Sequence, residues 1–370
     1  MKKILFVIHD LHHGGAEKVL VNLVNHMDKS RFAVSILALF GGGVNEQFLS
    51  PDVRLLHGHS RMIPGNSHIM KLFSPRQLFR HYIREKYDVI VSYLEGPSAR
   101  IVSGCPEDGT RLVSWVHCTI KTEQELAIGF RNAEEARRCY QRFDRSIFVS
   151  EGVQNAFCAF VDVSAPQVLY NTMDSAWILK QAEAQLPSMV FLPQEIKLLG
   201  IGKLMPVKGF DRLVRIHKRL RMEDNLPVHT YLLGEGAEQG NLEGQIAAEG
   251  LAGSVTLLGY QKNPYQYLRK ADLFVCASHA EGFSTAATEA LIVGTPVIST
   301  RVSGMEEMLG AHNEYGVITD NDEEALYQGL KAMLTKSGML EHYRKMGVQR
   351  GAFFNTERTV ADVEKMLECL

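Results

Sequence analysis

The sequence predicts an α/β protein made of two parallel-sheet domains, and three observations lead to this prediction. Short apolar runs recur along the 370 residues, and amphipathic segments of helical length separate them. Runs without polar alternation are typical of parallel strands that helices cover on both faces. The runs form two series, divided near residues 174–195 by a stretch with a proline and no clear periodicity. Each series is therefore expected to form its own sheet.

The strands of each series follow from these runs. The first series predicts strands at 3–8, 33–39, 88–92, 112–117 and 146–150, and Tyr170-Asn171-Thr172 ends a further one. The second series predicts strands at 197–200, 228–233, 255–258, 273–277, 296–300 and 316–319. Residues 357–370 carry an apolar stripe at helical spacing. We expect an N-terminal domain at 1–175, a linker at 176–194, a second domain at 195–352, and a last helix at 353–370 that packs on the first domain.

Composition narrows the class of protein. The chain is 45% hydrophobic and 22% charged, which is typical of a globular protein. A net charge of −2 gives no reason to expect a nucleic-acid partner. Six cysteines without a C-x-x-C pair fit reduced thiols better than disulfides or a zinc site. The first apolar run has only five residues, too short for a signal peptide or a membrane span, so we expect a cytoplasmic protein.

Two glutamates eight residues apart, Glu281 and Glu289, are the most informative feature of the second half. They follow the predicted strand at 273–277 and flank the start of a helix that runs to Gly294. Free backbone N–H groups and the helix dipole favour an anion at such a start. Two hydrogen-bond acceptors on either side of a phosphate cradle suit a ligand with hydroxyl groups at each end of a phosphate bridge. A nucleotide sugar has that shape.

Two lysines follow the first strand of the second series. Lys203 and Lys208 could neutralise a diphosphate, although surface lysines are usually only solvated. Their combination with the glutamates in one predicted sheet favours binding. Gly234 and Tyr260 lie after neighbouring strands, where a flat base could approach the backbone. Ordinary turn chemistry explains these two residues as well, and we give base binding less weight.

The first domain offers less specific candidates. Gly14 and Gly15 lie at a strand-to-helix turn, where they allow close approach of a ligand or serve only the turn. The loop lacks G-x-G-x-x-G, so a dinucleotide fingerprint is absent. His117 ends a strand and could bind a sugar hydroxyl or assist proton transfer, but a lone histidine there is more often structural. Ser150 is best explained as a helix N-cap.

Asp320-Asn321-Asp322 is similar to the D-x-D of metal-dependent sugar transferases. A helix follows directly, and acidic residues at a helix start need no metal to explain them. We therefore predict no metal site in this chain.

Two segments, 71–86 and 131–145, are rich in arginine and lysine with apolar residues between them. A basic amphipathic helix can lie on an anionic bilayer, which would place the protein on the inner face of the plasma membrane. It can equally be a surface helix with its apolar stripe on the core. Both interpretations stay open.

Taken together, the motifs resemble the retaining glycosyltransferases of family 4, which have the GT-B fold: two Rossmann-like domains that face each other across a cleft. The resemblance runs from residue 14 to about 300 and includes the last helix. The matching pieces are Gly14-Gly15-Ala16-Glu17-Lys18, Val168-Leu169-Tyr170-Asn171, Gly202-Lys203-Leu204, Lys208-Gly209, Leu233-Gly234-Glu235-Gly236, Glu281-Gly282-Phe283, Glu289-Ala290 and Gly294-Thr295-Pro296-Val297-Ile298.

The resemblance implies transfer of a hexosyl or N-acetylhexosaminyl group, with retention, from a nucleotide sugar, with UDP favoured. The implied acceptor is a glycan or a polyprenyl-diphosphate-linked oligosaccharide of capsule, O-antigen or related polysaccharides. Neither metal nor another cofactor is implied. The implied roles are catalysis beside the sugar for His117 and Glu281, ribose contact for Glu289, and further donor contacts for Gly15, Lys203, Lys208, Gly282, Phe283, Ser284 and Thr285.

Two positions depart from the family pattern. Lys203 stands where the family usually has arginine, so the bidentate fork is lost. Ser303-Gly304 replaces the usual Gly-Gly, with Glu307 as the matching acid. Neither change argues for loss of activity.

Other functions fit the sequence less well. A sugar-nucleotide epimerase or a phosphorylase would need a different acid–base set or a cofactor-linked lysine, and no such constellation is recognisable in the sequence. A nucleotide-sugar-binding protein without turnover could lose Glu281 or His117, but both are present. A dinucleotide dehydrogenase is disfavoured by the missing fingerprint. For the transferase we expect the two domains to close on the donor and exclude water.

Overall fold

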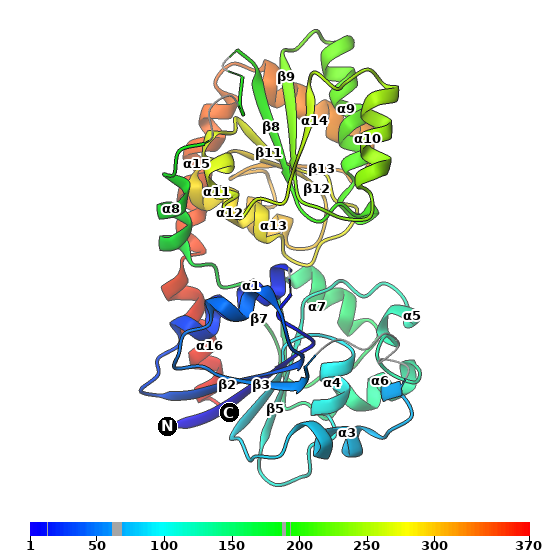
Figure 1. Ribbon diagram of the computed structural model, residues 1–370, viewed down its shortest axis with the longest axis vertical. Coiled ribbons are helices and arrows are strands. Elements are labelled where there is room, and N and C mark those ends of the chain that lie inside the picture. The colour runs from blue at the N-terminus through cyan, green and yellow to red at the C-terminus, as the bar shows by residue number, and fades with distance from the viewer. Residues whose placement is uncertain (13, 61–68, 187–189, 193) are drawn as a thin grey trace. The chain divides into compact units, whose positions relative to one another are not determined.

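The computed structural model describes residues 1–12, 14–60, 69–186, 190–192 and 194–370. The chain divides into two compact units: Met1–Met173 together with Thr356–Leu370, and Asp174–Asn355. Each unit has its own parallel β-sheet covered by helices (Figure 1). The predicted α/β class with two parallel sheets is confirmed. Of the segment expected to be a linker, residues 187–189 and 193 lie outside the described residues.

The sheet of the first unit has seven parallel strands. They are β1 (Lys2–Ile8), β2 (Phe32–Phe40), β3 (Arg54–His59), β4 (Val89–Ser92), β5 (Arg111–Val116), β6 (Arg145–Phe148) and β7 (Pro166–Val168). Their order is β3-β2-β1-β4-β5-β6-β7, and Ile4 pairs with Val34 on one side and Val89 on the other. From β1 the chain adds β2 and β3 on one side, and it then crosses over to add β4 to β7 on the other side of β1. The boundary between β1 and β4 is therefore the switch point of the sheet. Open α/β sheets bind ligands at the carboxyl ends of strands at such a switch point.

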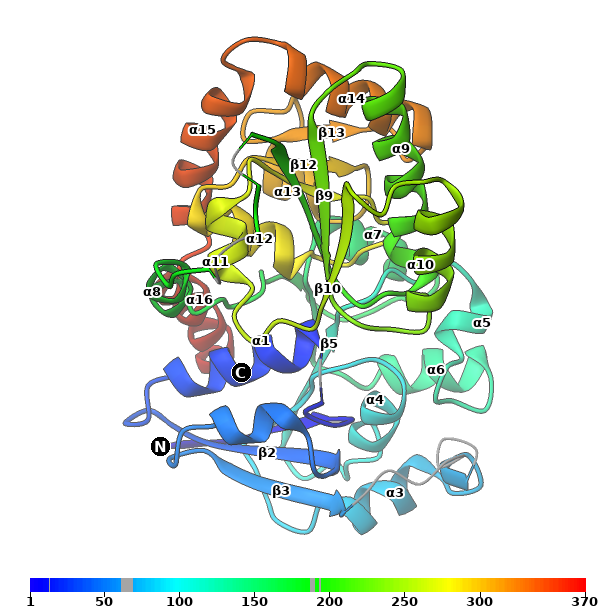
Figure 2. The same cartoon turned by 45° about the horizontal axis from the view of Figure 1, so that its top comes forward.

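Helices cover both faces of this sheet. They are α1 (Gly15–His26), the 3-10 helix η1 (Val44–Phe48), α3 (Pro75–Tyr82), α4 (Pro97–Val102), α5 (Glu123–Leu126), α6 (Ala133–Tyr140), α7 (Glu151–Cys158) and α16 (Thr356–Glu368). Right-handed crossovers in opposite directions from the switch point place helices on opposite faces. Accordingly, α1 contacts α16, while α4 contacts both α3 and α6 (Figures 1 and 2).

The last helix, α16, is an integral part of the first unit. Val363, Met366 and Leu367 are buried. Thr356 donates a hydrogen bond to the carbonyl of Met173 at 2.9 Å, and Lys2 Nζ donates to the carbonyl of Leu367 at 2.8 Å. The chain therefore returns to the first unit after completing the second.

The sheet of the second unit has six parallel strands. They are β8 (Ile196–Ile201), β9 (Val228–Leu233), β10 (Val255–Gly259), β11 (Leu273–Cys276), β12 (Val297–Thr300) and β13 (Val317–Thr319). Their order is β10-β9-β8-β11-β12-β13, so the switch point lies between β8 and β11. Leu198, Leu232, Leu273 and Ile298 of the sheet belong to one buried core.

The second unit is also covered on both faces. Its helices are α8 (Ser175–Ala182), the 3-10 helix η2 (Pro206–Lys208), α9 (Phe210–Met222), α10 (Gln239–Ala248), α11 (Tyr265–Lys270), α12 (Thr285–Val293), α13 (Met305–Leu309), α14 (Glu323–Thr335) and α15 (Met339–Phe353). Helices α9, α10 and α14 pack together on one face, and α8, α11, α12 and α15 on the other (Figures 1 and 2). Among the helices in the described part of the chain, none has the length and apolarity needed to cross a bilayer.

Each strand predicted from an apolar run is present, and the ends differ by at most two residues except in β7, which ends at Val168, before the expected Tyr170-Asn171-Thr172. Strand β3 was not predicted. It is a half-exposed edge strand, and its sequence contains Gly58 between two histidines, His57 and His59. Such a strand carries little of the apolar signal on which the prediction rests.

Candidate functional site

The carboxyl ends of the second unit's strands bring the loops after β8, β9, β10 and β11 together. The Gly202 N–H bonds the carbonyl of Leu233, and the Gly234 N–H bonds that of Gly259 at 2.9 Å. The loops after β8, β9 and β10 are thereby joined in a row. On the other side of the switch point, the His279 N–H bonds the carbonyl of Val207 at 2.8 Å and ties the loop after β11 to η2.

Two predicted site residues, Lys208 and Glu281, form an ion pair in this region. The Lys208 Nζ lies 2.6 Å from Glu281 Oε1, and Ser278 Oγ donates to the same oxygen at 2.6 Å. The lysine stem runs past Gly202, where an added Cβ would lie 3.3 Å from Lys208 Cε. Both side chains retain some solvent access, 25% for Lys208 and 12% for Glu281. An anionic ligand could therefore compete with Glu281 for the ammonium group.

A buried arginine that sequence reasoning missed supports the loop that carries Glu281. The Arg212 guanidinium donates to the carbonyls of Ala277 and Ser278, each at 2.7 Å, and to Asn321 Oδ1 at 3.0 Å. Thr300 Oγ1 also donates to the Ser278 carbonyl at 2.6 Å. Arg212 lies among the apolar residues of α9 that face the core, and a charge in that register is the signal that could have revealed it.

Two glycines are required where these loops meet. Gly209 has φ +63°, and an added Cβ would lie 2.1 Å from the carbonyl oxygen of Ala277. Gly234 has φ +136°, and an added Cβ would lie 1.9 Å from the carbonyl oxygen of Gly202. Both contacts are backbone to backbone, so no side chain can move aside. Turn geometry therefore accounts for Gly234 without a base, while Tyr260, which follows the Gly259 that Gly234 contacts, is half exposed.

Helix α12 begins at Thr285, four residues after Glu281, so its first turn lies at the same edge of the sheet. Ser284 is its N-cap and accepts a hydrogen bond from the Ala287 N–H. The Phe283 side chain is buried and packs edge-on against Phe354, with ring centroids 5.6 Å apart. Only the backbone of Phe283 can therefore contact a ligand. The N–H groups of residues 282–285 and the helix dipole make this turn suitable for a phosphate.

The remaining candidates of the second unit differ in their surroundings. Glu289 lies one turn inside α12, is almost fully buried, and accepts a hydrogen bond from Tyr265 Oη at 3.3 Å. Lys203 is exposed on the loop after β8, and within the described residues it has no ion-pair partner. The structure thus brings Lys208, Glu281 and the start of α12 together and leaves Lys203 and Tyr260 on the surface.

In the first unit, His117 directly follows β5. Its ring lies 4.8 Å from that of Tyr93 and stacks on that of Trp115 at 6.2 Å between centroids. In the part of the chain that the structure describes, its buried Nε2 has no hydrogen-bond partner. Burial lowers the pKa of His117 to about 3, so the imidazole is neutral at pH 7. The ring can form one hydrogen bond with a ligand through Nε2, but it carries no charge.

Glu95, which the sequence analysis did not single out, holds the backbone beside His117. Its Oε1 accepts the N–H groups of His117 and Cys118, each at 2.5 Å. Burial raises the pKa of Glu95 above its ordinary value, although these two hydrogen bonds act in the opposite direction. An acidic residue soon after β4, at the switch point of the sheet, is the signal that could have identified it.

The other candidates of the first unit have clear local roles. Gly14 is extended, with φ −169°, and an added Cβ would meet only the movable Glu17 carboxylate, so the turn itself does not require glycine. Gly15 is the exposed first residue of α1, and His13 lies outside the described residues. Ser150 is the N-cap of α7, as predicted.

The acidic triplet 320–322 has structural roles. Asp322 caps α14 by accepting the Ala325 N–H, and Asn321 contacts Arg212. Across the described ranges, no three side chains of the metal-ligating types are grouped to hold an ion.

Two family descriptions match the chain, one for each half. Residues 13–177 match "Glycosyltransferase Family 4", and residues 184–350 match "Glycosyl transferases group 1". The chain belongs to glycosyltransferase family 4. The resemblance noted in the sequence is confirmed, and the matched ranges contain the Lys208–Glu281 pair and His117.

Curated relatives of this family 4 chain include two bacterial proteins. The first is the N-acetylgalactosamine-N,N'-diacetylbacillosaminyl-diphospho-undecaprenol 4-alpha-N-acetylgalactosaminyltransferase of Campylobacter jejuni. It is 30% identical over 203 residues, or 54% of this chain and 53% of the relative. The second, an uncharacterized glycosyltransferase of Haemophilus influenzae, is 23% identical over 352 residues, or 90% of this chain and 91% of the relative. In several matches, the first among them, the chain spans about half of the relative's length.

Solved structures with the GT-B fold cover the whole chain. HepE of Anabaena in complex with UDP-glucose has a TM-score of 0.78 at 19% identity, with 100% of both chains covered. The sucrose-phosphate synthase of Thermosynechococcus elongatus has a TM-score of 0.80 at 18% identity, with 100% of this chain and 98% of that chain covered. This family 4 chain therefore has the GT-B fold.

Proposed function

We propose that this family 4 chain transfers a sugar from a UDP-sugar to a glycan or a polyprenyl-diphosphate-linked oligosaccharide, with retention, in the synthesis of a cell-surface polysaccharide. The observation that carries the proposal is the Lys208–Glu281–Ser278 cluster at the start of α12. It combines a cation that can exchange partners, a carboxylate, and a helix N-terminus at one edge of a sheet.

The donor would use these groups in a definite order. When the diphosphate lies on the first turn of α12, Lys208 exchanges Glu281 for a phosphate oxygen. The released Glu281 carboxylate, still held by Ser278, can then accept hydrogen bonds from the hydroxyls of the sugar. Glu289, one turn further along α12, is the acceptor for ribose hydroxyls. As the bond from the anomeric carbon to the diphosphate breaks, Lys208 and the helix dipole stabilise the charge on the departing UDP.

The preference for UDP and for a lipid-linked acceptor draws on the relatives. Structures of HepE contain UDP, UDP with glucose, or UDP-glucose. The Campylobacter jejuni relative is named for an acceptor on diphospho-undecaprenol. Both observations support, for this chain, a uridine donor and an acceptor carried by a polyprenyl diphosphate. Because Lys208 and α12 supply the positive potential, we expect turnover without a divalent metal or another cofactor.

The test is UDP release from a panel of UDP-sugars, measured with and without undecaprenyl-diphosphate-linked oligosaccharides. We expect acceptor-dependent release with one donor. Lys208→Met should lower kcat/KM by about 10²-fold, because it removes the charge that stabilises the leaving diphosphate. The matched control is Lys336→Met, an exposed lysine after α14 that should react like the unaltered protein. Conversion of a UDP-sugar without acceptor would indicate an epimerase. Binding of donors without any turnover would indicate an inactive binding protein.

A further inference from the structure

Four large apolar side chains are exposed near one another in the first unit. Ile69, Leu72 and Phe73 are 52%, 77% and 46% exposed, and Ile128, on the loop before α6, is 66% exposed. Arg131, three residues after Ile128, bonds the backbone at residues 71 and 72, so the two segments adjoin. A cluster of exposed apolar side chains such as this one is typical of an interaction surface.

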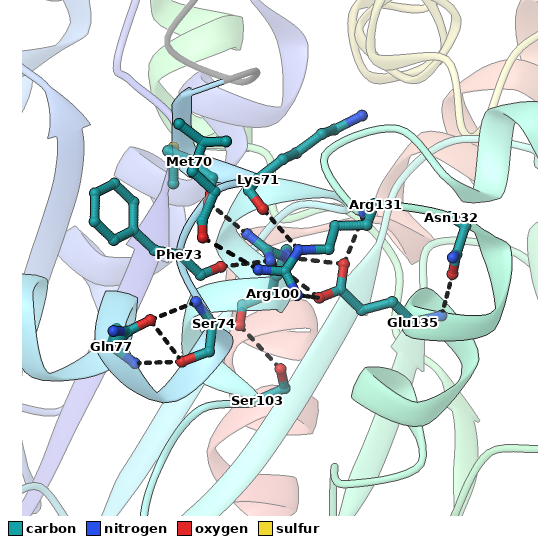
Figure 3. A network of polar contacts seen from close by, with 11 residues as sticks. Met70, Lys71, Phe73, Ser74, Gln77, Arg100, Ser103, Arg131, Asn132 and Glu135 are labelled. Atoms are coloured by element: carbon teal, nitrogen blue, oxygen red, sulfur yellow. Dashed lines mark hydrogen bonds and ion pairs between the residues drawn. The ribbon is translucent and has the colours of Figure 1, made fainter.

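The backbone beneath these side chains is held by a clamp, which we define as Arg100, Arg131 and Glu135 (Figure 3). Residues 70–73 present four consecutive carbonyl oxygens to two guanidinium groups. Arg100 donates to the first and the last, at 2.8 and 2.7 Å. Arg131 donates to the second and third, at 2.7 and 3.2 Å. The backbone of the segment is therefore fixed in place, with the Met70 side chain buried and those of Leu72 and Phe73 exposed.

Glu135 completes the clamp. It accepts two hydrogen bonds from Arg100, at 3.1 and 3.0 Å, and one from the Arg131 N–H at 2.7 Å. Arg100 is fully buried and Glu135 nearly so. Removing one partner of such a buried pair is strongly destabilising, because the other charge stays behind unpaired. The chain thus uses a buried ionic network to position a segment in which Met70 is buried but Leu72 and Phe73 stay exposed.

The two basic segments that flank this surface differ in how their charges are used. On α3 and just after it, Arg76, Arg80 and Arg84 are exposed and, within the described residues, have no ion-pair partner. Leu78 and Phe79 face the core between them. In segment 131–145 the arginines are occupied: Arg131 by the clamp, Arg137 by Glu123 and the Phe160 carbonyl, Arg138 by Glu134, Arg142 by the carbonyls of Ser103 and Cys105, and Arg145 by Gln167.

A pocket of about 360 Å³ opens beside the start of α3. Arg76, Arg138 and Arg142 line it, together with Ser74 and Glu135. Arg138 is paired with Glu134, Arg142 donates to the carbonyls of Ser103 and Cys105, and Glu135 is paired with Arg100. Arg76 is therefore the guanidinium group of this pocket that has no ion-pair partner within the described residues, and it lies next to the exposed apolar side chains.

We propose that Leu72, Phe73 and Ile128, together with Arg76, Arg80 and Arg84, form a docking face for an anionic lipid bilayer. The apolar side chains enter the boundary between headgroups and acyl chains, and the arginines bind lipid phosphates. A second copy of this chain is a poorer occupant, since a two-fold interface would bring the same uncompensated arginines face to face. The inference needs neither the proposed donor nor the proposed acceptor, because it rests only on this surface.

The test is co-sedimentation with vesicles of 30% phosphatidylglycerol in phosphatidylcholine, or of phosphatidylcholine alone, at low and high salt. We expect binding to the anionic vesicles at low salt, weakened by salt. Arg76→Gln with Arg80→Gln should lower the partition coefficient about 30-fold, from roughly fivefold per basic residue at an anionic surface. Leu72→Ser with Phe73→Ser should lower it by a similar factor. Matched controls are Lys336→Gln with Lys365→Gln, and Met222→Ser with Leu179→Ser, which remove exposed charges and apolar groups elsewhere.

Three results would overturn the proposal. The unaltered protein could fail to bind anionic vesicles, or the docking-face variants could bind as well as their controls. Alternatively, Leu72→Ser with Phe73→Ser could dissolve an oligomer seen by sedimentation equilibrium, which would make this face an interface between copies. UDP binding and thermal unfolding are measured for every variant. Unchanged values show that a loss of vesicle binding reflects neither misfolding nor failure of the proposed donor site.

Discussion

Two buried histidines, one in each unit, share a low pKa for the same physical reason. Burial lowers the pKa of His117 and of His217 to about 3. His217 is satisfied by Thr230 and Ser254, at 2.8 and 2.9 Å, whereas Nε2 of His117 has no partner in the described structure. The hydrogen-bonding capacity of His217 is used within the core, whereas Nε2 of His117 keeps the capacity for one more hydrogen bond.

Both histidines should make the protein less stable in acid. A histidine with a pKa near 3 when folded and near 6.5 when unfolded gains its proton only on unfolding, so stability falls as the pH drops from about 6.5 towards 3. Between pH 7 and pH 5, each should remove about 2 kcal/mol from the unfolding free energy. Urea unfolding of His117→Asn and His217→Asn at both pH values should show a shallower decline than the unaltered protein. An unchanged decline would mean that the histidine in question is protonated in the folded state.

At the scale of elements, the loop between η2 and α9 depends on a backbone contact that only glycine permits. Gly209→Ala introduces a Cβ 2.1 Å from a carbonyl oxygen at a positive φ. We expect a loss of about 2–4 kcal/mol in unfolding free energy from strain and displacement of the loop. Because Lys208 is the adjacent residue, the affinity for the donor substrate should fall as well.

Gly240→Ala and Gly244→Ala are the controls. Both glycines lie in α10 with open space around the added Cβ, and each substitution should stabilise the protein by about 0.5–1 kcal/mol. Denaturant unfolding measures all three.

The same scale shows what the sequence could and could not reveal. Uninterrupted apolar runs located the strands except β3, and the order of strands along the chain then put Lys208, Glu281 and α12 at one edge of a sheet. The residues that hold this edge in place were missed. Arg212 acts through carbonyl oxygens of residues far away in sequence, and Glu95 acts through two N–H groups that directly follow β5. Contacts of this kind produce no recognisable residue spacing in the sequence, so they cannot be predicted from it. The occupied arginines of segment 131–145 were read only as charge, because their partners become visible only in the fold.

At the scale of the whole molecule, each unit has its own sheet and core. The groups proposed to bind the donor substrate, Lys208 and the start of α12, lie in the second unit. UDP at 100 times its Kd should stabilise that unit by about 2.7 kcal/mol, which raises its Tm by roughly 5–10 °C. Differential scanning calorimetry measures this shift. If a lysine and a helix dipole hold the diphosphate, excess EDTA should leave the shift unchanged. A shift that requires added Mg²⁺ or Mn²⁺ would contradict the proposed metal-independent site.

The clamp of Arg100, Arg131 and Glu135 has a consequence for geometry. It connects residues 70–73 to α4 and α6, which pack against each other over the sheet of the first unit. Gly96, directly after Glu95, lies against the carbonyl of Ile128, with 2.9 Å from an added Cβ to that oxygen. On a bilayer, the lipid would then fix the tilt of this sheet as well as its proximity. His117 would stand at a constant height above the headgroups, and an acceptor drifting in the plane of the lipid would be selected by the length of its glycan.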